Sequence, residues 1–188
     1  MSNTTINDFS LLCRLFGNLF YRTPQDPILA GTFSWLQQGN LRSNWALSTD
    51  TQSEQALNIV EKEAYPTQLE SHYQALFGEN GAVSMAISAY GVSVDEFLMF
   101  RQQRAMPEIA DIDNVALLLL TASWIEDHID STEAQKTLFE HFLLPCLSKF
   151  LGQVETFDHG FYKALAQLTR DALSAMADEL EESENLAE

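Results

Sequence analysis

The sequence has few of the residues that define small disulfide-bonded or all-β domains. It contains two cysteines, five prolines and eight glycines among 188 residues. Cys13 and Cys146 each stand beside apolar neighbours, which indicates buried, reduced thiols of a cytoplasmic protein rather than a disulfide framework. A β-sandwich or barrel needs many turns punctuated by glycine and proline, so helices are the favoured secondary structure.

Positive charge is also scarce. Ten lysines and arginines stand against 27 aspartates and glutamates, which gives a formal net charge of -17. This charge repels phosphate backbones and anionic lipid head groups, so nucleic acid and membrane surfaces are not expected partners. It attracts a cationic partner, although acidity of this size also serves solubility alone.

Long apolar runs are absent from the sequence. The longest, residues 115–120, cannot span a bilayer. Residues 1–6 do not combine a basic region with a following apolar run, so no secretory signal is expected. We therefore expect a cytoplasmic protein that does not insert into membranes.

Apolar residues recur instead at the three-and-four spacing of a helical face. The first such pattern begins at Phe9, after Asn7 and Asp8 as expected caps, and ends near residue 23. Asp26-Pro27 supplies a cap and a first-turn proline for a second helix, which Gly39 terminates. Two helices joined by a short turn are therefore expected at the start of the chain.

Similar signals predict helices along the rest of the chain, over residues 54–64, 67–77, 94–106, 115–125 and 132–142, with a last one from Asp158. Pro145 either kinks the preceding helix or begins its successor. No internal repeat or long linker is present, so residues 1–188 are expected to form one all-α domain, a compact bundle of about seven to nine helices. The acidic tail is expected to fray from about residue 182.

Residues 79–91 are the segment most typical of a functional loop. They are glycine-containing and apolar, yet they lack a clean helical period. Aromatic residues before and after this loop either line a groove for an apolar peptide or belong to the core, and their helical spacing favours the core. They are Tyr73, Phe77, Tyr90, Phe97 and Phe100.

Two Asp-His pairs raise the alternative of a metal-dependent helical hydrolase. They are Asp127-His128 and Asp158-His159, both at expected helix boundaries. Helical phosphohydrolases use the order His-Asp together with further ligands from other helices, which is not the order here. The chain also lacks a nucleophile elbow and a phosphate-binding glycine loop. We therefore expect no catalytic residue, no metal site and no cofactor.

Several segments taken together resemble the TorD/DmsD/NarJ family of redox-enzyme maturation chaperones, from about residue 9 to residue 182. These segments are Tyr21-Arg22-Thr23-Pro24, Tyr73-Gln74-Ala75-Leu76-Phe77-Gly78, Phe142-Leu143-Leu144-Pro145 and Phe161-Tyr162-Lys163-Ala164-Leu165-Ala166. The YcdY-like branch is the most similar, through Arg14, Pro24-Gln25-Asp26-Pro27, Thr121-Ala122-Ser123-Trp124 and Leu168-Thr169-Arg170-Asp171-Ala172.

The resemblance implies a helical chaperone that holds an apo-enzyme, often through its twin-arginine signal peptide, until a cofactor such as molybdopterin has been inserted. Such a peptide is basic and apolar, which suits an acidic protein with an aromatic groove. Two family signatures are altered here. The Asp-His-Ile signature falls on Asp113-Asn114-Val115, and the Pro-Tyr-x-Ser segment falls on Met85-Ala86-Ile87-Ser88.

The expected client-binding residues are Tyr73, Leu76, Phe77, Met85, Ser88, Tyr90, Asp113 and Asn114. Their apolar members would bury the apolar segment of an apo-metalloenzyme or its signal peptide, and Asp113 would pair with a cation or orient the neighbouring loop. Two alternatives stay open. One is the metal-dependent hydrolase, and the other is a bundle that only associates with itself, for example as a homodimer, through residues 83–90.

Overall fold

The computed structural model describes the backbone of residues 4–187 and the side chains of residues 8–186. Every regular element in this part of the chain is helical, so the predicted all-α bundle is confirmed. The longer helices are α1 (Thr4–Tyr21), α4 (Thr51–Glu63), α5 (Pro66–Phe77), α6 (Val94–Gln103), α7 (Ala116–His128), α9 (Leu144–Phe157) and α10 (Phe161–Ala187). The shorter elements are η1 (Pro27–Leu29), α2 (Ala30–Gln37), α3 (Asn40–Ser43), η2 (Ile87–Tyr90), α8 (Thr132–Leu138) and η3 (Phe139–Leu143).

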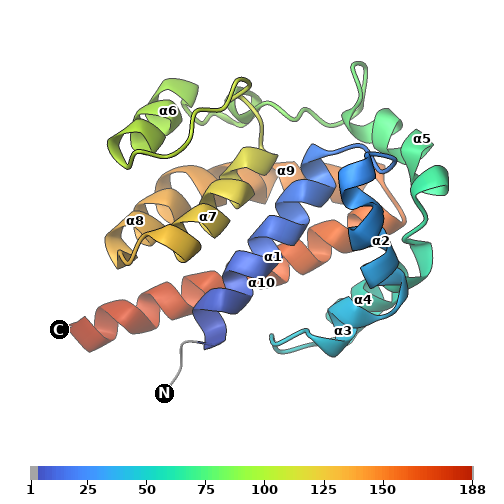
Figure 1. Ribbon diagram of the computed structural model, residues 1–188, viewed down its shortest axis with the longest axis horizontal. Coiled ribbons are helices and arrows are strands. Elements are labelled where there is room, and N and C mark those ends of the chain that lie inside the picture. The colour runs from blue at the N-terminus through green and yellow to red at the C-terminus, as the bar shows by residue number, and fades with distance from the viewer. Residues whose placement is uncertain (1–3, 188) are drawn as a thin grey trace.

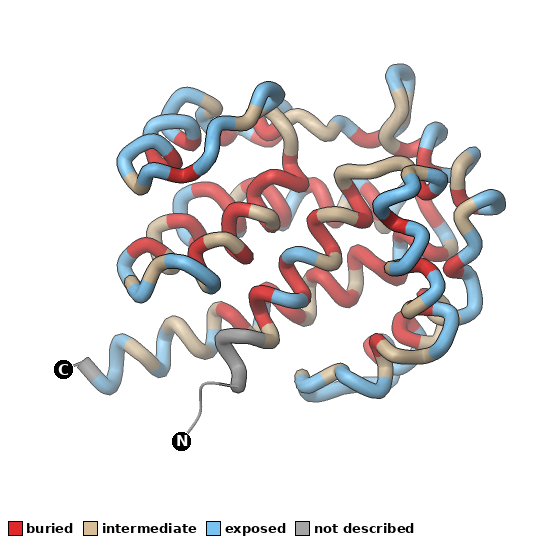
Figure 2. Tube along the Cα trace, in the orientation of Figure 1, coloured by how far each residue is buried: buried red, intermediate tan, exposed pale blue. Residues whose placement is uncertain are grey.

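Four helices, α1, α7, α9 and α10, form the centre of the bundle (Figure 1). α1 packs along α7, while α10 packs on α9, α4 and α1. The helices from α2 to α5 lie toward one end of this group, and α6 and α8 lie toward the other. Buried residues concentrate where the central helices meet (Figure 2). None of the described helices is long and apolar enough to cross a membrane.

Gly17 allows α1 to approach α7 closely. A Cβ atom at this position would lie 2.8 Å from Cδ2 of Leu120 and 3.3 Å from Cβ of Leu119. A side chain here would therefore push α7 away, because protein interiors have little space to absorb an extra methyl group. The glycine explains why the two helices pack side by side.

Side-chain caps mark several helix starts. The N–H of Ser53 donates to Oδ1 of Asp50 at 2.8 Å ahead of α4, and the N–H of Glu96 donates to Oγ of Ser93 at 3.2 Å ahead of α6. Each cap satisfies one of the amide groups that a helix leaves unpaired in its first turn. The predicted cap at Ser93 is confirmed.

Two predicted helix starts are wrong by a few residues. α1 begins at Thr4, so Asn7 and Asp8 lie inside the helix instead of capping it. α8 is capped by Ser131 and not by Thr132, because Ser131 has the extended backbone of a cap and accepts the N–H of Ala134 at 3.2 Å. Adjacent cap-forming residues compete locally, and the path of the preceding chain selects one.

Pro145 begins a new helix and is preceded by a wide turn. The chain passes from α8 into η3, a π-helical segment, and then into α9, whose first turn contains Pro145. Proline has no amide hydrogen to give the carbonyl one turn earlier, and its ring crowds that carbonyl. The widened turn relieves both problems. Of the two outcomes predicted for Pro145, the structure shows the second.

The acidic tail is helical, which corrects the expectation that it frays from about residue 182. α10 continues without interruption to Ala187. Lys136 of α8 forms an ion pair with Glu184, and Oγ of Ser183 donates to the carbonyl of Glu179 at 2.9 Å. A lysine from a neighbouring helix therefore offsets part of the repulsion between the tail carboxylates, a tertiary contact that composition alone does not reveal.

Glu126 places a carboxyl group between α7, α8 and α10. Its Oε2 atom is buried and has no hydrogen-bond partner among the described residues. Burial, followed by the negative charges of Glu179 and Asp127, raises the pKa of Glu126 from 4.5 to about 7, against a smaller lowering by a hydrogen bond with Gln135. The carboxyl group is therefore more stable in its protonated form in the folded protein.

Five aromatic rings, which we call the aromatic cluster, fill the centre of the bundle. They are Phe20, Tyr73, Phe77, Phe150 and Tyr162, from α1, α5, α9 and α10. The ring centroid of the fully buried Phe150 lies 5.3 Å from that of Phe20 and 6.0 Å from that of Phe77. Phe77 in turn lies 5.2 Å from Tyr73 and 5.4 Å from Tyr162, both with tilted or edge-on rings. Such geometry adds to the free energy gained from burial alone.

Replacing Phe150 with alanine should lower the free energy of unfolding by about 3 to 5 kcal/mol, because it removes the ring around which the aromatic cluster packs. Urea denaturation followed by circular dichroism measures the loss. The matched control is Phe157→Ala on the same helix, whose side chain is 55% exposed and whose loss should stay within about 0.5 kcal/mol. Similar losses in the two variants would contradict the central role of the cluster.

The raised pKa of Glu126 predicts that its contribution to stability falls as pH rises. Ionising Glu126 costs more in the folded protein than in the unfolded chain. This cost grows as pH rises from 4.5, the pKa in the unfolded chain, to about 7, the pKa in the folded protein. Glu126→Gln should therefore be more stable than the wild type by about 2 kcal/mol at high pH and nearly equal to it at low pH. Denaturation across this range tests the trend, with the exposed Glu181→Gln as control. A pH-independent difference would refute it.

Candidate functional site

The eight candidate residues come from three segments and form two layers. Tyr73, Leu76 and Phe77 lie on α5, Met85, Ser88 and Tyr90 lie in or beside η2, and Asp113 and Asn114 precede α7. The inner layer belongs to the aromatic core. The outer layer is formed by the exposed and partly exposed residues of two segments, 84–90 and 111–115, which we call the paired loops. Tyr90, at the end of the first segment, belongs to the inner layer.

The inner layer is held by burial and by hydrogen bonds to the main chain. Tyr73, Leu76 and Tyr90 are each buried. The hydroxyl of Tyr73 donates to the carbonyl of Phe20 at 2.8 Å, and that of Tyr90 donates to the carbonyl of Ser84 at 2.7 Å. Burial raises the pKa of both tyrosines to about 12. These three residues are part of the core, the interpretation that helical spacing favoured. The neighbouring Phe77 is partly exposed.

Gly81 turns the chain from α5 back over the core. The N–H of Ala82 donates to the carbonyl of Ala75 at 3.0 Å, and that of Val83 donates to the carbonyl of Leu76 at 2.8 Å. A Cβ atom on Gly81 would lie 2.3 Å from the carbonyl oxygen of Leu76, so no other residue fits without moving the turn. This close approach sets the path of the loop that follows.

The apolar residues of that loop face inward. Val83 is 2% exposed and Ile87 is fully buried. The self-association alternative required an apolar surface over residues 83–90, and the structure places most of its apolar side chains in the core. The loop therefore presents mainly main chain, small side chains and the partly exposed Met85 to solvent.

Ser88 and Asp113 join the paired loops. The N–H of Ser88 donates to Oδ1 of Asp113 at 3.0 Å, and its hydroxyl donates to Oδ2 at 2.6 Å. Beside them the N–H of Val115 donates to the carbonyl of Met85 at 2.7 Å. The carboxylate of Asp113 thus orients the neighbouring loop, which is one of the two roles considered for it.

Asn114 caps α7. Its side-chain Oδ1 accepts the N–H of Ala116 at 2.9 Å, one of the amides that the first turn leaves free. The paired loops are therefore anchored to the start of the buried α7 as well as to each other. Met85, Ser88, Asp113 and Asn114 form a contiguous set, which lies outside the buried layer of Tyr73, Leu76 and Tyr90.

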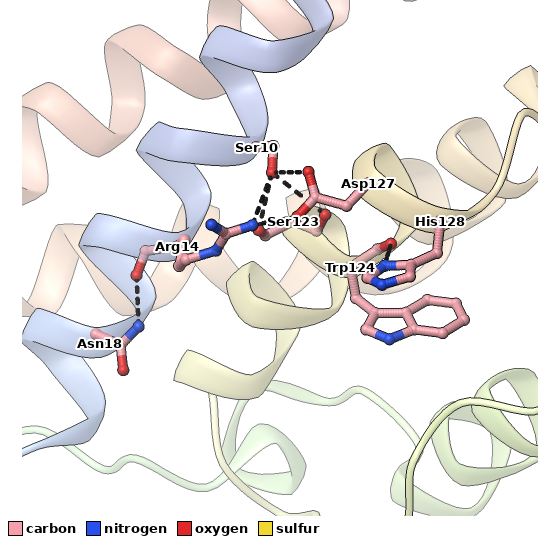
Figure 3. Close-up of polar contacts among 7 residues, drawn as sticks. All are labelled: Ser10, Arg14, Asn18, Ser123, Trp124, Asp127 and His128. Atoms are coloured by element: carbon pink, nitrogen blue, oxygen red, sulfur yellow. Dashed lines mark hydrogen bonds and ion pairs between the residues drawn. The ribbon is translucent and has the colours of Figure 1, made fainter.

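The pair Asp127-His128 is engaged in contacts within the bundle (Figure 3). The hydroxyl of Ser10 donates to Oδ1 of Asp127 at 2.5 Å, and Arg14 forms an ion pair with the other carboxylate oxygen. Nδ1 of His128 lies 2.9 Å from the carbonyl of Trp124, and the two rings stack at 4.6 Å. Asp127 therefore ties α7 to α1.

The second pair has a different structural role. Asp158 accepts the N–H groups of Gly160 at 3.1 Å and Lys163 at 2.9 Å, which caps the start of α10 as the sequence predicts. The turn that contains His159 lies at the opposite end of the molecule from the C-terminal end of α7 (Figure 1). No group of three or more histidines, cysteines or carboxylates within the described residues is arranged to hold a metal ion. The hydrolase alternative therefore has no assembled donor set in this part of the chain.

Comparison with known proteins gives relatives along nearly the whole chain, although no family model matches it. An uncharacterized protein of Haemophilus influenzae is 57% identical and covers 97% of this chain and 100% of its own length. The chaperone protein YcdY of Escherichia coli is 44% identical over 94% of this chain and 98% of its own. The Tat proofreading chaperone DmsD of Salmonella typhimurium is 26% identical over 89% and 88%. The chain belongs to the TorD/DmsD family of redox-enzyme maturation chaperones.

Membership in the TorD/DmsD family identifies the protein as a chaperone that assists redox-enzyme maturation. The positions that depart from the family signatures can now be located. Asn114, at the position of the signature histidine, caps α7, and Met85 contributes its carbonyl to the link between the paired loops. Both positions therefore take part in joining the loops to α7 in this protein.

The residues that sequence reasoning missed line an apolar groove between α1 and α2. The groove has a volume of about 620 Å³, and Leu11 and Ile28 on its rim are 61% and 65% exposed. The sequence contains one signal for it. Leu11 falls between the stripe residues Phe9 and Leu12, on a side of α1 that periodicity assigns to solvent.

Removing the carboxylate of Asp113 should separate the paired loops. Asp113→Ala leaves the N–H and hydroxyl of Ser88 without their acceptors, so amide exchange at Ser88 should accelerate about tenfold or more, with a loss of about 1 to 2 kcal/mol of stability. Hydrogen exchange read residue by residue measures the effect. The exposed Asp111→Ala, two residues earlier, is the control. Unchanged protection of Ser88 in the Asp113 variant would show that the link does not hold the loops.

Proposed function

We propose that this chaperone acts in the cytoplasm on the precursor of a metal-dependent redox enzyme. Its paired loops receive a basic, apolar segment of that precursor, such as a twin-arginine signal peptide, and the chaperone itself catalyses no reaction. The relative named as a Tat proofreading chaperone supports the choice of client. The observation that carries the proposal is the link between Ser88 and Asp113, which fixes two separate loops at the surface above the aromatic cluster.

The charge around the paired loops favours a cationic segment. Glu108 and Asp111 are exposed in the chain that leads to Asp113. The cations of the neighbouring elements form no ion pair with these carboxylates, because Arg101 donates to Thr121, Arg104 lies over the ring of Phe100, and Nζ of Lys149 donates to the carbonyl of Tyr90 at 3.1 Å. This surface therefore presents unpaired negative charge, which speeds and orients the docking of a basic partner.

Apolar contact is available at the edge of the same surface. Phe77 and Met85 are partly exposed and pack against the core, so they can add a few apolar contacts without opening the bundle. Tyr73, Leu76 and Tyr90 support this edge from beneath. In this proposal Phe77 and Met85 contact the client, and the three buried residues hold them in position.

Catalysis by the chain's own nucleophiles is disfavoured by burial. Cys13 and Cys146 are enclosed in the core, and this burial raises the pKa of each thiol to about 12. A thiolate is the reactive form, so neither side chain is prepared for nucleophilic attack. Binding accounts for the observed arrangement without a chemical step.

The test is an affinity purification from native cytosol with mass spectrometry, using the wild type, Met85→Arg and Phe77→Ala. The wild type should enrich one redox-enzyme precursor. Met85→Arg replaces an apolar contact with a cation that repels the client's basic residues, and Phe77→Ala removes an apolar contact, so each should weaken binding by about 1 to 3 kcal/mol. Titration of the enriched precursor's N-terminal peptide measures the affinities, after circular dichroism has shown that the variants are folded.

The control variant is Met99→Ser, which removes an exposed methionine from α6, away from the paired loops. It should enrich the precursor as the wild type does. Unchanged binding in both Met85→Arg and Phe77→Ala would remove the paired loops as the client site. Enrichment of only mature, cofactor-loaded enzymes would contradict a role in maturation.

A further inference from the structure

A groove of about 620 Å³ separates α1 from α2. α1 packs on α7 and α10, and α2 packs on α3 and α4, so the two helices use their other faces to join the bundle. The residues that line the groove come from α1, η1, α2, α3 and the segment that follows α3. No described segment of the chain fills the space between them. None of the eight candidate client-binding residues takes part.

One wall of the groove is formed by side chains of α1, and the opposite wall by side chains of η1 and α2. On α1 the lining residues Asp8, Leu11 and Leu15 are three and four residues apart, so they lie on one face of the helix. Ile28 of η1 and Trp35 of α2 stand on the opposite wall. The stripe on α1 from residue 8 to residue 18 extends about 15 Å, the length of nearly three helical turns.

The rim of the groove is unusually apolar for an exposed surface. Leu11 and Ile28 are 61% and 65% exposed, and Leu15 and Trp35 are partly exposed. Single exposed apolar residues are ordinary, but four around one concavity form a contiguous patch of the kind that marks an interaction surface. Three turns of an apolar helix face match this patch in length.

Gly31 opens the wall on the side of α2. A Cβ atom at this position would meet no other atom within 4 Å, so the space beside the glycine is empty. A second helix can approach α2 closely there, as Gly17 allows α1 to approach α7. The same open space means that a large side chain at position 31 would occupy the groove without disturbing the core.

The charges around the groove indicate which kind of partner it can bind. Residues 1–61 contain three arginines and no lysine. Arg14 is paired with Asp127, Arg22 with Asp26, and Arg42 with Glu54 and Glu61. The wall of the groove adds the carboxylate of Asp8. Arg14 also lines the groove, but its ion pair with Asp127 compensates its charge. An anionic ligand such as a fatty acid or a nucleotide therefore meets no uncompensated cation among the lining residues, and a second copy of this chain would bring a further charge of -17.

We propose that the groove between α1 and α2 binds a cationic amphipathic helix of a partner protein. The apolar face of that helix lies against Leu11, Leu15, Ile28 and Trp35, and its lysines or arginines flank the apolar face toward Asp8 and the acidic surface. This surface is separate from the paired loops, so it goes beyond the proposed function and does not depend on the client's identity.

The test uses a defined probe, a peptide of about 14 residues, or roughly 20 Å as a helix, built from leucines on one face and lysine and alanine elsewhere. Isothermal titration calorimetry with the full-length protein gives its dissociation constant. One control peptide has the same composition in a scrambled order that breaks the leucine stripe, and another has glutamate in place of lysine. The amphipathic lysine peptide should bind at least about tenfold more tightly than either control.

Variants of unchanged charge then locate the binding surface. Gly31→Phe fills the groove, and the double variant Leu11→Ser, Ile28→Ser removes its exposed apolar rim. Each should weaken binding of the lysine peptide about tenfold or more. The matched control is Leu98→Ser, Met99→Ser on α6, which removes two exposed apolar side chains elsewhere and should leave the affinity unchanged. Circular dichroism shows whether each variant is folded. If Gly31→Phe does not fold, the double variant Leu11→Ser, Ile28→Ser alone tests the proposal.

Several results would overturn the proposal. Equal affinity for the scrambled peptide would show that general electrostatic attraction accounts for binding. Unchanged affinity in the folded groove variants would place the peptide elsewhere, including at the paired loops. Concentration-dependent association of the wild type that the rim variant abolishes, measured by analytical ultracentrifugation, would make a second copy the occupant. Failure of the client experiment leaves these results unaffected, because the probe and the variants are different.

Discussion

The packing of Phe150 in the aromatic cluster is the contact on which most of the structure depends. Its ring touches Phe20 of α1 and Phe77 of α5, and it lies 6.0 Å from the ring of Tyr90 below the paired loops. Elements that are distant in sequence therefore share one buried ring. Because Tyr90 also holds the carbonyl of Ser84, the position of the paired loops follows from the packing of this cluster. Substitutions in the inner layer should therefore disturb the stability of the bundle and the position of the paired loops together.

At the surface of the molecule, half of the cations are paired with carboxylates, and the remaining charge is strongly negative. Five of the basic residues, Arg14, Arg22, Arg42, Lys136 and Arg170, form ion pairs between or within helices. Exposed pairs of this kind contribute little stability individually. Their larger effect is to leave few free cations at the surface of a protein with a net charge of -17. The resulting field attracts cationic partners and repels anionic ones.

Local signals in the sequence predicted the helices well, and tertiary contacts account for the errors. Ser93 and Asp158 cap helices as expected because capping depends on a few neighbouring residues. The acidic tail stays helical because Lys136, from a distant segment, pairs with Glu184. Composition could not reveal that contact, since it lies 48 residues away in sequence.

Local sequence signals are limited in the same way at the candidate site. Helical spacing cannot separate a buried aromatic such as Tyr73 from one that lines a groove, because both occupy the apolar face of α5. The link between Ser88 and Asp113 spans 25 residues, and only the resemblance to a family placed the two together in advance. The groove beside Leu11 was missed for a related reason. Periodicity describes one helix at a time, and a gap between two helices depends on how both pack on a third.

The asparagine at position 114 shows how a departure from the family pattern can preserve structure while changing chemistry. An imidazole would gain or lose a proton within the physiological pH range, whereas an amide keeps the same hydrogen-bonding groups throughout. Asn114 uses its side-chain oxygen to cap α7, and the adjacent Val115 amide binds the carbonyl of Met85. The amide side chain therefore gives this chaperone a junction between the paired loops and α7 in which the cap carries no charge at any pH.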